Sequence, residues 1–272
     1  MSIITPCRNA IGTIGDTLLS VLSARRVLQN DGLDLEHLLI DGGSTDGTAE
    51  VVARHVARHG FCSWMPDIIG GPYAAMNVGL RQARGCYAHV LNADDRLLDP
   101  HAFAAFLKAG HRSGASVLLA SIGYFRRPDL RLRSLWRVDP LPANSAEWKR
   151  QLLRGLHYPH PGFIAATERY RQQSFDEAYS LSADYKLMQA ILLTQSTEDL
   201  PMTCQQPLVA MAEGGVTGNW KAVLRGWHQL NAINQEMGIQ TSCLRRYWRK
   251  LQQRFRPPDQ PLNLPILEAT DS

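Results

Sequence analysis

The chain has 272 residues, of which 44% are hydrophobic, and a formal net charge of +4. A chain of this size can bury one large core, so we expect one domain with a tail. The charge excess is too small to indicate nucleic-acid binding by itself, and it gathers near the C-terminus. The 5 cysteines stand far apart without C-x-x-C spacing, which argues against a disulfide framework or a zinc site and fits a reducing compartment.

The N-terminal sequence shows no targeting signal. Met1 is followed at once by strand-like residues, without a basic segment or an apolar run long enough for a signal peptide or a membrane span. We therefore expect the chain to stay in the cytoplasm, where it is made.

The first half of the chain alternates between strand-like and helix-like segments. Pro6 is expected to stop the first strand, and Pro72 lies near the first turn of a helix, where proline is common. The order β-α-β-α favours a parallel sheet. The expected strands cover residues 2–5, 35–40 and 61–65, and the expected helices cover about 11–28, the residues leading up to about 59, and 73–81.

The strand-like stretch 87–95, YAHVLNADD, runs directly into two adjacent carboxylates. In an open α/β sheet ligands bind at the carboxyl ends of the strands, so Asp94 and Asp95 are expected at such a site. Two neighbouring carboxylates can hold a divalent cation. They can equally cap the helix that Pro100 helps to begin, because aspartate is common at helix N-termini. The pair alone favours neither interpretation.

Three further features bear on a ligand site. Asp41 ends the second strand and is expected at the same edge as Asp94, which favours a shared ligand. The helix N-terminus near Tyr73 offers free N–H groups for a phosphate, although it can also be an ordinary helix start. Asn77 costs helix propensity, so it either makes a specific contact or faces water. Neither G-x-x-x-x-G-K-[ST] nor G-x-G-x-x-G occurs at a strand-to-helix turn, which argues against a P-loop ATPase and a dinucleotide-binding fold.

Eight short blocks follow one another along the chain in a distinctive order and spacing. They are residues 2–6 (SIITP), 40–48 (IDGGSTDGT), 73–79 (YAAMNVG), 91–95 (LNADD), 160–161 (HP), 175–177 (FDE), 182–185 (SADY) and 214–217 (GGVT). Together they resemble glycosyltransferase family 2 with the GT-A fold, over roughly residues 2–218. Within the family, the sequence is most similar to bacterial enzymes that build exopolysaccharide, colanic-acid-type or O-antigen repeat units.

The resemblance implies an α/β GT-A fold, with a Rossmann-like, mostly parallel sheet flanked by helices and a C-terminal helical tail. It places Thr5, Pro6 and Asp41 at the base of a nucleoside diphosphate, and Asp41 is suited to accept a hydrogen bond from a base N–H. The donor-binding set that it implies consists of Thr5, Pro6, Arg8, Asp41, Ser44, Tyr73, Asn77, Asn92 and Ala93.

The resemblance also aligns residues 92–94 with the D-x-D metal motif of the family. Asp94 is the expected ligand of a Mn2+ or Mg2+ ion that bridges the donor diphosphate, and Asp95 is a second expected ligand. This sequence departs from the pattern, because Asn92 replaces the first aspartate. The amide oxygen of Asn92 can contact ribose or metal but adds no charge. Metal binding is therefore expected to be weaker, and Asp95 becomes more important as a candidate ligand.

Residues in the second half supply the expected chemistry. Asp184 aligns with the general base of the family, which takes the proton of the acceptor hydroxyl in an inverting transfer. From the residues alone, an N-cap for a helix beginning at Tyr185 explains Asp184 better, and the resemblance reverses that order. His160 aligns with a family histidine that contacts acceptor, diphosphate or metal, although a packed, backbone-bonded histidine explains it equally well. Gly214 and Gly215 resemble a loop near the donor phosphates, or form a plain turn.

The expected organisation is a GT-A glycosyltransferase domain over 1–220, a basic amphipathic helical segment over 221–256 and a disordered tail over 257–272. Residues 244–256, LRRYWRKLQQRFR, place apolar side chains at helical spacing and cations on the other faces. Such a helix either binds anionic lipid or completes the core or a dimer. An arginine-rich run over 126–137 is more typical of a solvated hairpin than of a phosphate clamp.

Together these features predict an inverting, metal-assisted hexosyltransferase of surface polysaccharide biosynthesis. The expected partners are a UDP- or GDP-linked sugar donor and a saccharide or polyprenyl-diphosphate-linked acceptor, without nucleic acid. Peripheral contact with the inner face of the plasma membrane through 244–256 is an option. One alternative is a non-catalytic nucleotide-sugar-binding protein on the same fold. Another is a nucleotidyltransferase, which would need a phosphate loop with glycine and lysine where this chain has CRN at 7–9.

Overall fold

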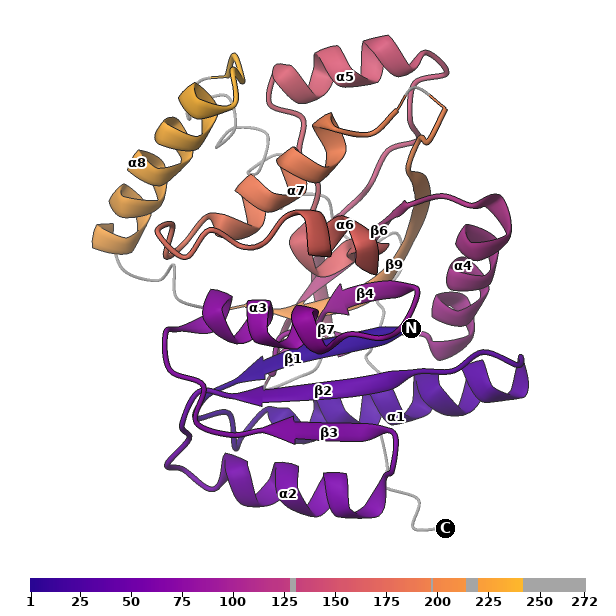
Figure 1. The fold of residues 1–272 in the computed structure, drawn as a ribbon, viewed down its shortest axis with the longest axis vertical. Coiled ribbons are helices and arrows are strands. Elements are labelled where there is room, and N and C mark those ends of the chain that lie inside the picture. The colour runs from indigo at the N-terminus through magenta and orange to yellow at the C-terminus, as the bar shows by residue number, and fades with distance from the viewer. Residues whose placement is uncertain (128–130, 197, 214–219, 242–272) are drawn as a thin grey trace.

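The computed structural model describes residues 1–127, 131–196, 198–213 and 220–241, with residues 220–222 described by their backbone only. The strands are β1 (Ser2–Cys7), β2 (Glu36–Asp41), β3 (Cys62–Met65), β4 (Tyr87–Val90), β5 (Arg96–Leu97), β6 (Val117–Arg126), β7 (Arg131–Trp136), β8 (Phe163–Ala166) and β9 (Met202–Ala212). The helices are α1 (Ile14–Asn30), α2 (Thr48–Arg58), α3 (Pro72–Gln82), α4 (Pro100–Ser113), α5 (Ser145–Leu153), α6 (Thr167–Gln172), α7 (Ala183–Leu193) and α8 (Trp220–Glu236), with a short 3-10 helix η1 (His160–Gly162). Within the described residues, the strands form one nine-stranded sheet in the order β3-β2-β1-β4-β8-β6-β9-β5, with β7 paired to β6 (Figure 1).

Most strands of this sheet run in the same direction. β1 pairs in parallel with β2 and β4, β2 with β3, and β6 with β9, whereas β5, β7 and β8 are antiparallel to their neighbours. Because β8 lies antiparallel between β4 and β6, the strands β1 to β4, β6 and β9 all share one direction. The predicted α/β fold with a mostly parallel sheet flanked by helices is confirmed. Parallel strands are normally covered on both faces, and β1 and β4 are buried along their whole length.

The prediction that Pro6 ends the first strand is wrong. β1 continues to Cys7, and Pro6 pairs with Ile40 of β2. Proline lacks an N–H, so inside a sheet it normally removes one hydrogen bond from the ladder. Here the last pair between β1 and β4 joins Ile4 to Val90, so Pro6 lies beyond the point where β1 has a neighbour on that side. The other predicted strands and helices of the first half are present, with small shifts of their ends.

Helices cover both faces of the sheet and fill two main cores (Figure 1). On one face, side chains of α3, α5, α6 and α7 pack with the sheet around the buried Trp148. On the other face, α1 and α4 pack with the sheet around Phe103. α3 can approach the sheet closely because Gly79 has no side chain: a Cβ there would stand 2.4 Å from Cγ2 of Ile4. This close packing fixes the start of α3 at the carboxyl ends of the parallel strands.

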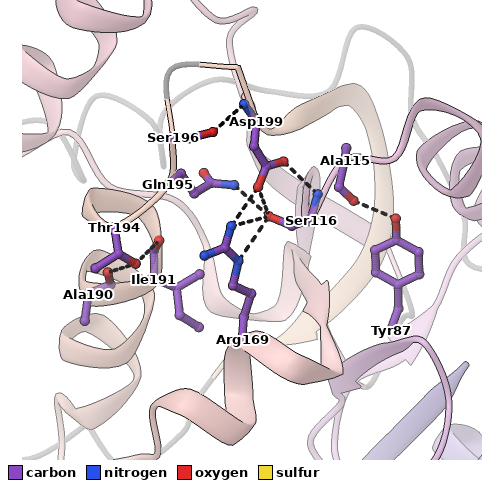
Figure 2. A network of polar contacts seen from close by, with 10 residues as sticks. All are labelled: Tyr87, Ala115, Ser116, Arg169, Ala190, Ile191, Thr194, Gln195, Ser196 and Asp199. Atoms are coloured by element: carbon purple, nitrogen blue, oxygen red, sulfur yellow. Dashed lines mark hydrogen bonds and ion pairs between the residues drawn. The ribbon is translucent and has the colours of Figure 1, made fainter.

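The opposite edge of the sheet, where β6 begins, is closed by a polar network (Figure 2). Ser116 donates hydrogen bonds to Asp199 through its N–H and its hydroxyl, and Arg169 of α6 pairs with Asp199 at 2.7 Å. Gln195 donates to the Oγ of Ser116 at 3.1 Å. An open pocket of about 500 Å³ lies beside this network, and none of the predicted site residues lines it. The network therefore joins β6, α6 and the segment after α7, away from the predicted site.

α8 packs against the beginning of α7. Ile233 of α8 is fully buried, Tyr185 donates a hydrogen bond of 2.9 Å to Oδ1 of Asn234, and Lys186 pairs with Glu236 at 2.6 Å. The predicted segment 221–256 thus contains most of a helix, while its basic stretch 244–256 and the predicted tail 257–272 lie outside the described residues. Within the part of the chain that is described, no helix combines the length and the apolar character needed to cross a membrane.

Two buried histidines predict how stability responds to pH. Burial lowers the pKa of His37 to about 3 and the pKa of His89 to about 4. Both side chains therefore stay neutral in the folded protein, whereas in the unfolded chain they take up protons below their ordinary pKa of 6.5. As the pH falls from 6.5 to about 4, we expect each histidine to lower the free energy of unfolding by about 3 kcal/mol.

Urea unfolding followed by circular dichroism at several pH values in this window measures the effect. The variant His37→Gln keeps an amide that can hydrogen-bond to Thr5, but it has no group that titrates. Its stability should fall less steeply with pH than that of the unmodified protein, and an equal slope would contradict the assignment.

Candidate active site

The carboxyl end of β2 holds Asp41 in a fixed orientation. Asp41 is buried, and its Oδ1 accepts hydrogen bonds from the N–H of Ser44 at 3.0 Å and from its hydroxyl at 2.7 Å. Arg8 follows β1 and is exposed, and its side chain lies over Gly42, with its Cδ 3.4 Å from the position of a Cβ there. A cation thus stands beside an oriented carboxylate where these two parallel strands end.

Not all predicted donor-binding residues reach this edge. Thr5 is fully buried within β1, and its Oγ1 lies 2.9 Å from Nε2 of His37. Pro6 is also buried within the strand. The side chains of both residues are therefore enclosed by the sheet. Gly214 and Gly215 lie outside the described residues.

Asn9 and the main chain of Ile68, which the sequence analysis did not single out, tie two neighbouring loops to the segment that begins with Asp41. Asn9 has a φ of 50°, and its Oδ1 accepts the N–H of Thr45 at 2.8 Å, while the Oγ of Ser44 accepts the N–H of Asn9 at 2.9 Å. In the loop after β3, the N–H of Ile68 donates to the main-chain oxygen of Asp41 at 2.8 Å. The composition of residues 42–48 indicated a turn. It did not indicate that Asn9, in the loop after β1, would bond to this turn.

Asn92 and Asp95 form a pair at the end of β4. Nδ2 of Asn92 donates to Oδ2 of Asp95 at 3.0 Å, and Oδ1 of Asp95 accepts the N–H of Ala212, at the end of β9, at 3.1 Å. Asp95 is 1% exposed, and Ala93 between the pair is buried too. Burial and the neighbouring charge of Asp94 raise the pKa of Asp95. In this arrangement both carboxylate oxygens of Asp95 are used within the protein. Of the two acids, only Asp94 can present an oxygen to an outside ion.

The alternative that the acidic pair caps the following helix does not hold. α4 begins at Pro100, and its N-cap is Asp99. The carboxylate of Asp99 accepts hydrogen bonds from the N–H groups of His101 at 2.9 Å and Ala102 at 3.0 Å. The capping role therefore belongs to an aspartate that the sequence analysis passed over, although its position directly before proline is a recognisable N-cap signal.

Asp94 keeps a partly exposed carboxylate beside a fixed cation. Burial raises the pKa of Asp94, and the charge of Arg127 acts in the opposite direction. Arg127 donates to the main-chain oxygen of Asp94 at 3.0 Å and pairs with Asp16 at 3.1 Å. Nothing in its arginine-rich run distinguished Arg127, because its partners lie more than 30 positions away.

Asp184 lies in the first turn of α7 and faces the start of α3. α7 begins at Ala183 with Ser182 at its N-cap, so Asp184 is not the cap of a helix that begins at Tyr185. Instead, its Oδ1 accepts a hydrogen bond of 3.1 Å from the hydroxyl of Tyr73. The side chain of Asp184 is partly exposed, so this carboxylate is both held and accessible.

Phe175 stands between Tyr73 and His160. Its ring stacks on that of Tyr73 with centroids 5.4 Å apart, and it meets the ring of His160 edge-on at 5.8 Å. Burial lowers the pKa of His160, and the charge of Asp184 partly opposes this effect. Among the described residues, no backbone group forms a hydrogen bond with the His160 ring. The alternative in which backbone groups satisfy this histidine is therefore not observed.

Asn77 makes a specific contact with the second half of the chain. Its Nδ2 donates to the main-chain oxygen of Phe175 and to Oε1 of Glu177, each at 2.9 Å, and its Oδ1 accepts the N–H of Phe175 at 2.9 Å. Asn77 is 5% exposed, and its amide is fully used by these bonds. Its observed role is to hold the segment that contains Phe175 against α3.

One contact of Asp184 and one contact beside His160 link this part of the chain to the strands. Tyr73 lies at the start of α3, and Figure 1 shows the first turns of α3 and α7 on the side toward which β1 to β3 point. On the other side, Nε2 of His89 in β4 lies 2.8 Å from the main-chain oxygen of Pro161, the residue after His160. β4 then leads directly to the acidic stretch. The predicted acids at this edge are Asp41, Asp94 and Asp184.

Comparisons with known proteins identify the family. The model of glycosyl transferase family 2 matches residues 2–178. The chain belongs to this family. An uncharacterized glycosyltransferase of Mycobacterium tuberculosis is 27% identical over 175 residues, which make up 63% of this chain and 63% of that protein. The poly-beta-1,6-N-acetyl-D-glucosamine synthase of Staphylococcus epidermidis is 32% identical over 103 residues, 38% of this chain and 24% of that synthase. These matches span less than two thirds of either relative.

Solved structures agree on the fold. The S. aureus TarS fragment 1–349 in complex with UDP-GlcNAc superposes with a TM-score of 0.62 at 17% identity, over 85% of this chain and 64% of that chain. A mannosyltransferase of Pyrobaculum calidifontis in complex with GDP-Man and Mn2+ gives a TM-score of 0.50 at 16% identity, over 84% and 61%. The fold is that of GT-A glycosyltransferases, so both the predicted family and the predicted fold are confirmed.

The pair of Asn92 and Asp95 yields a stability prediction. Asn92→Asp replaces the donor amide by a second carboxyl group about 3.0 Å from Oδ2 of the buried Asp95, whose pKa is already raised, so the two groups can stay together only if one of them is protonated. We expect this variant to lose about 1–3 kcal/mol of unfolding free energy. The double variant Asn92→Asp/Asp95→Asn restores the hydrogen bond with donor and acceptor exchanged, and the new amide oxygen can still accept from Ala212.

Chemical denaturation at neutral pH compares the two variants. The double variant should recover most of the loss, because the two positions contact each other and their effects are therefore not additive. A double variant that is no more stable than Asn92→Asp would show that the pair does not interact as described.

Proposed function

We propose that the protein is an inverting glycosyltransferase that moves a sugar from a nucleotide diphosphate to a saccharide or lipid-linked acceptor in surface polysaccharide biosynthesis. The observation that carries this proposal is the position of Asp184, a partly exposed carboxylate at the same sheet edge as Asp41 and Asp94. Membership of glycosyl transferase family 2 supports the reaction class. The similarity to a poly-N-acetylglucosamine synthase supports a polysaccharide product.

The donor nucleotide is proposed to bind at the ends of β1 and β2. Oδ1 of Asp41 is used by Ser44, and no residue within the described chain donates to its Oδ2, so this oxygen can accept a base N–H. Arg8 offers a guanidinium beside it for ribose or phosphate oxygens. Two structural neighbours contain UDP-GlcNAc and GDP-Man, which favours a nucleotide sugar over a free nucleotide.

The residues after β4 fit a divalent cation. Asp94 offers a carboxylate, and the amide of Asn92 offers its oxygen because its Nδ2 is bonded to Asp95. Mg2+ and Mn2+ prefer such oxygen ligands and complete their coordination with substrate phosphates and water. Among the described residues, no cluster of three or more His, Cys, Asp or Glu side chains could hold a metal ion. A bound ion supplies charge neutralisation for the departing diphosphate.

Asp184 is proposed as the general base. As the acceptor hydroxyl oxygen attacks C1 of the sugar, its proton passes to the carboxylate of Asp184. The bond between C1 and the diphosphate oxygen breaks, and its electron pair leaves with the diphosphate. Because attack comes from the face opposite the leaving group, the configuration at C1 inverts. His160 lies in the same cluster and, as a neutral imidazole, can hydrogen-bond the acceptor.

A non-catalytic nucleotide-sugar-binding protein on the same fold is the second candidate. It is favoured by Asn92, which leaves one carboxylate in the metal motif. Turnover of donor by the purified protein with a crude glycolipid extract separates the two candidates. The nucleotidyltransferase alternative fits less well, because Asn9 in the loop after β1 is used to hold the turn after β2.

The first functional prediction concerns the base. Asp184→Asn keeps the size of the side chain and its bond to Tyr73, but it removes the proton acceptor. We expect transfer to fall by at least about 100-fold while donor affinity stays close to that of the unmodified protein. Steady-state kinetics and isothermal titration with the donor measure the two quantities.

A matched control uses an aspartate away from the site. Asp34 pairs with Arg25 at the surface, and its side chain is 84% exposed, so Asp34→Asn should leave transfer unchanged. Asp184 would lose its assigned role if Asp184→Asn weakened donor binding and turnover equally, or if it kept full activity.

The second functional prediction concerns the ion. Asp94→Ala removes the proposed carboxylate ligand, so thermal stabilisation by a nucleotide sugar should no longer increase when Mn2+ is added. A panel of UDP- and GDP-linked sugars, tested with and without Mn2+, measures this effect and identifies the donor. Full activity of the unmodified protein in excess chelator would rule out the metal.

A further inference from the structure

Tyr73 joins the donor-side half of the molecule to the proposed base. It is the second residue of α3, and its hydroxyl donates a hydrogen bond of 3.1 Å to Oδ1 of Asp184, 111 positions later. Among the described residues, no other side chain donates to this carboxylate. Tyr73 therefore sets the position of Oδ1 of Asp184.

The hydroxyl of Tyr73 is a permanent donor. Burial and the charge of Asp184 raise the pKa of Tyr73 well above its ordinary value, so the phenol keeps its proton at neutral pH. A carboxylate side chain can rotate about its last bond, and a single hydrogen bond to Oδ1 sets the direction of Oδ2. The second oxygen is then held ready for a proton, and it does not need to be oriented when the acceptor arrives.

The ring of Tyr73 packs against a residue that is itself bonded to α3. Its ring stacks on Phe175 with an angle of 23° between the planes. Phe175 is bonded through its main-chain N–H and oxygen to the amide of Asn77, one turn further along α3. The tyrosine and the segment that leads to Asp184 therefore form one rigid unit with the start of α3.

We propose that Tyr73 is a positioning residue for Asp184, which differs from the donor-binding role that the family resemblance implies. This inference rests on the proposed function, because it assigns Tyr73 to the step in which the base accepts the acceptor proton. The geometry assigns it no role in nucleotide affinity. Loss of the hydroxyl should therefore slow the chemical step and leave donor binding intact.

The test compares two tyrosine-to-phenylalanine variants. Tyr73→Phe keeps the ring that stacks on Phe175 and removes only the hydroxyl. The control Tyr179→Phe makes the same change at a tyrosine that donates to the carboxylate of Glu236, also at 3.1 Å, in the neighbouring contact between the α7 region and α8. Glu236 has no assigned role in transfer.

The measurements are kcat, the KM for the donor, and the melting temperature. For Tyr73→Phe we expect kcat to fall about 10- to 100-fold, the worth of a hydrogen bond to a charged group, while the donor KM changes by less than about twofold. Tyr179→Phe should keep its kcat. The melting temperatures report any loss of stability, which should be larger in Tyr73→Phe because its hydrogen bond is partly buried, whereas that of Tyr179 is exposed.

Three outcomes would overturn the inference. An unchanged kcat in Tyr73→Phe would remove the positioning role, and a loss confined to donor KM would assign Tyr73 to the donor site. An equal loss of kcat in Tyr179→Phe would indicate a general structural effect. Asp184→Asn separates this inference from the proposed function: an inactive Asp184→Asn with a normal Tyr73→Phe removes only the positioning role, whereas an active Asp184→Asn removes the base.

Discussion

The reciprocal hydrogen bonds between Asn77 and the backbone of Phe175 join the two halves of this molecule. An asparagine within a helix lowers helix propensity, and a buried amide without partners is costly. Both costs are offset here because one side chain satisfies both main-chain groups of a residue 98 positions away. The contact fixes the chain segment that leads to α7, and so it fixes the distance between the donor-side edge of the sheet and Asp184. It adds to the core in which α3 and α7 already pack, and it ties the segment before α7 to the helix that carries Tyr73.

Burial of Asp95 also explains why asparagine can stand at position 92, where the family pattern has aspartate. An aspartate at position 92 would face the buried carboxylate of Asp95, which already accepts the N–H of Ala212. An asparagine removes that repulsion and donates a hydrogen bond instead. The neutral residue therefore stabilises the junction between β4 and β9, and a single carboxylate, Asp94, is left partly exposed. In the proposed metal site, the substrate diphosphate would complete the coordination of an ion.

Much of the fold could be predicted from the sequence, because local apolar periodicity and turn residues determine strands and helices. Pro6 was misjudged because its tolerance depends on where β4 ends, which is a property of the neighbouring strand. The positions of Asp41 and Asp94 at one edge followed from the parallel topology. The role of Asp99 as the N-cap of α4 could also have been predicted from the sequence, because the residue directly precedes Pro100.

The contacts that define the site were not predictable in the same way. Tyr73 and Asp184, or Asp94 and Arg127, are brought together by the packing of α3, α7 and the β6–β7 hairpin. No local pattern encodes such pairs. The family resemblance assigned Tyr73 and Asn77 to donor binding, which stays a prediction, and it did not indicate the hydrogen bonds that both residues make within the protein.

The position of Asp184 outside the matched family region has a consequence for specificity. Residues 2–178 contain Asp41, Asp94 and Tyr73, whereas Tyr185, next to Asp184, is bonded to Asn234 of α8. The proposed base thus contacts Tyr73, a residue within the family region, while the residue after it contacts a helix beyond that region. In the proposed reaction, the acceptor hydroxyl would have to reach Asp184 beside these residues. The part of the chain after residue 178 is therefore where we expect the choice of acceptor to be determined, while the choice of donor depends on the region that the family shares.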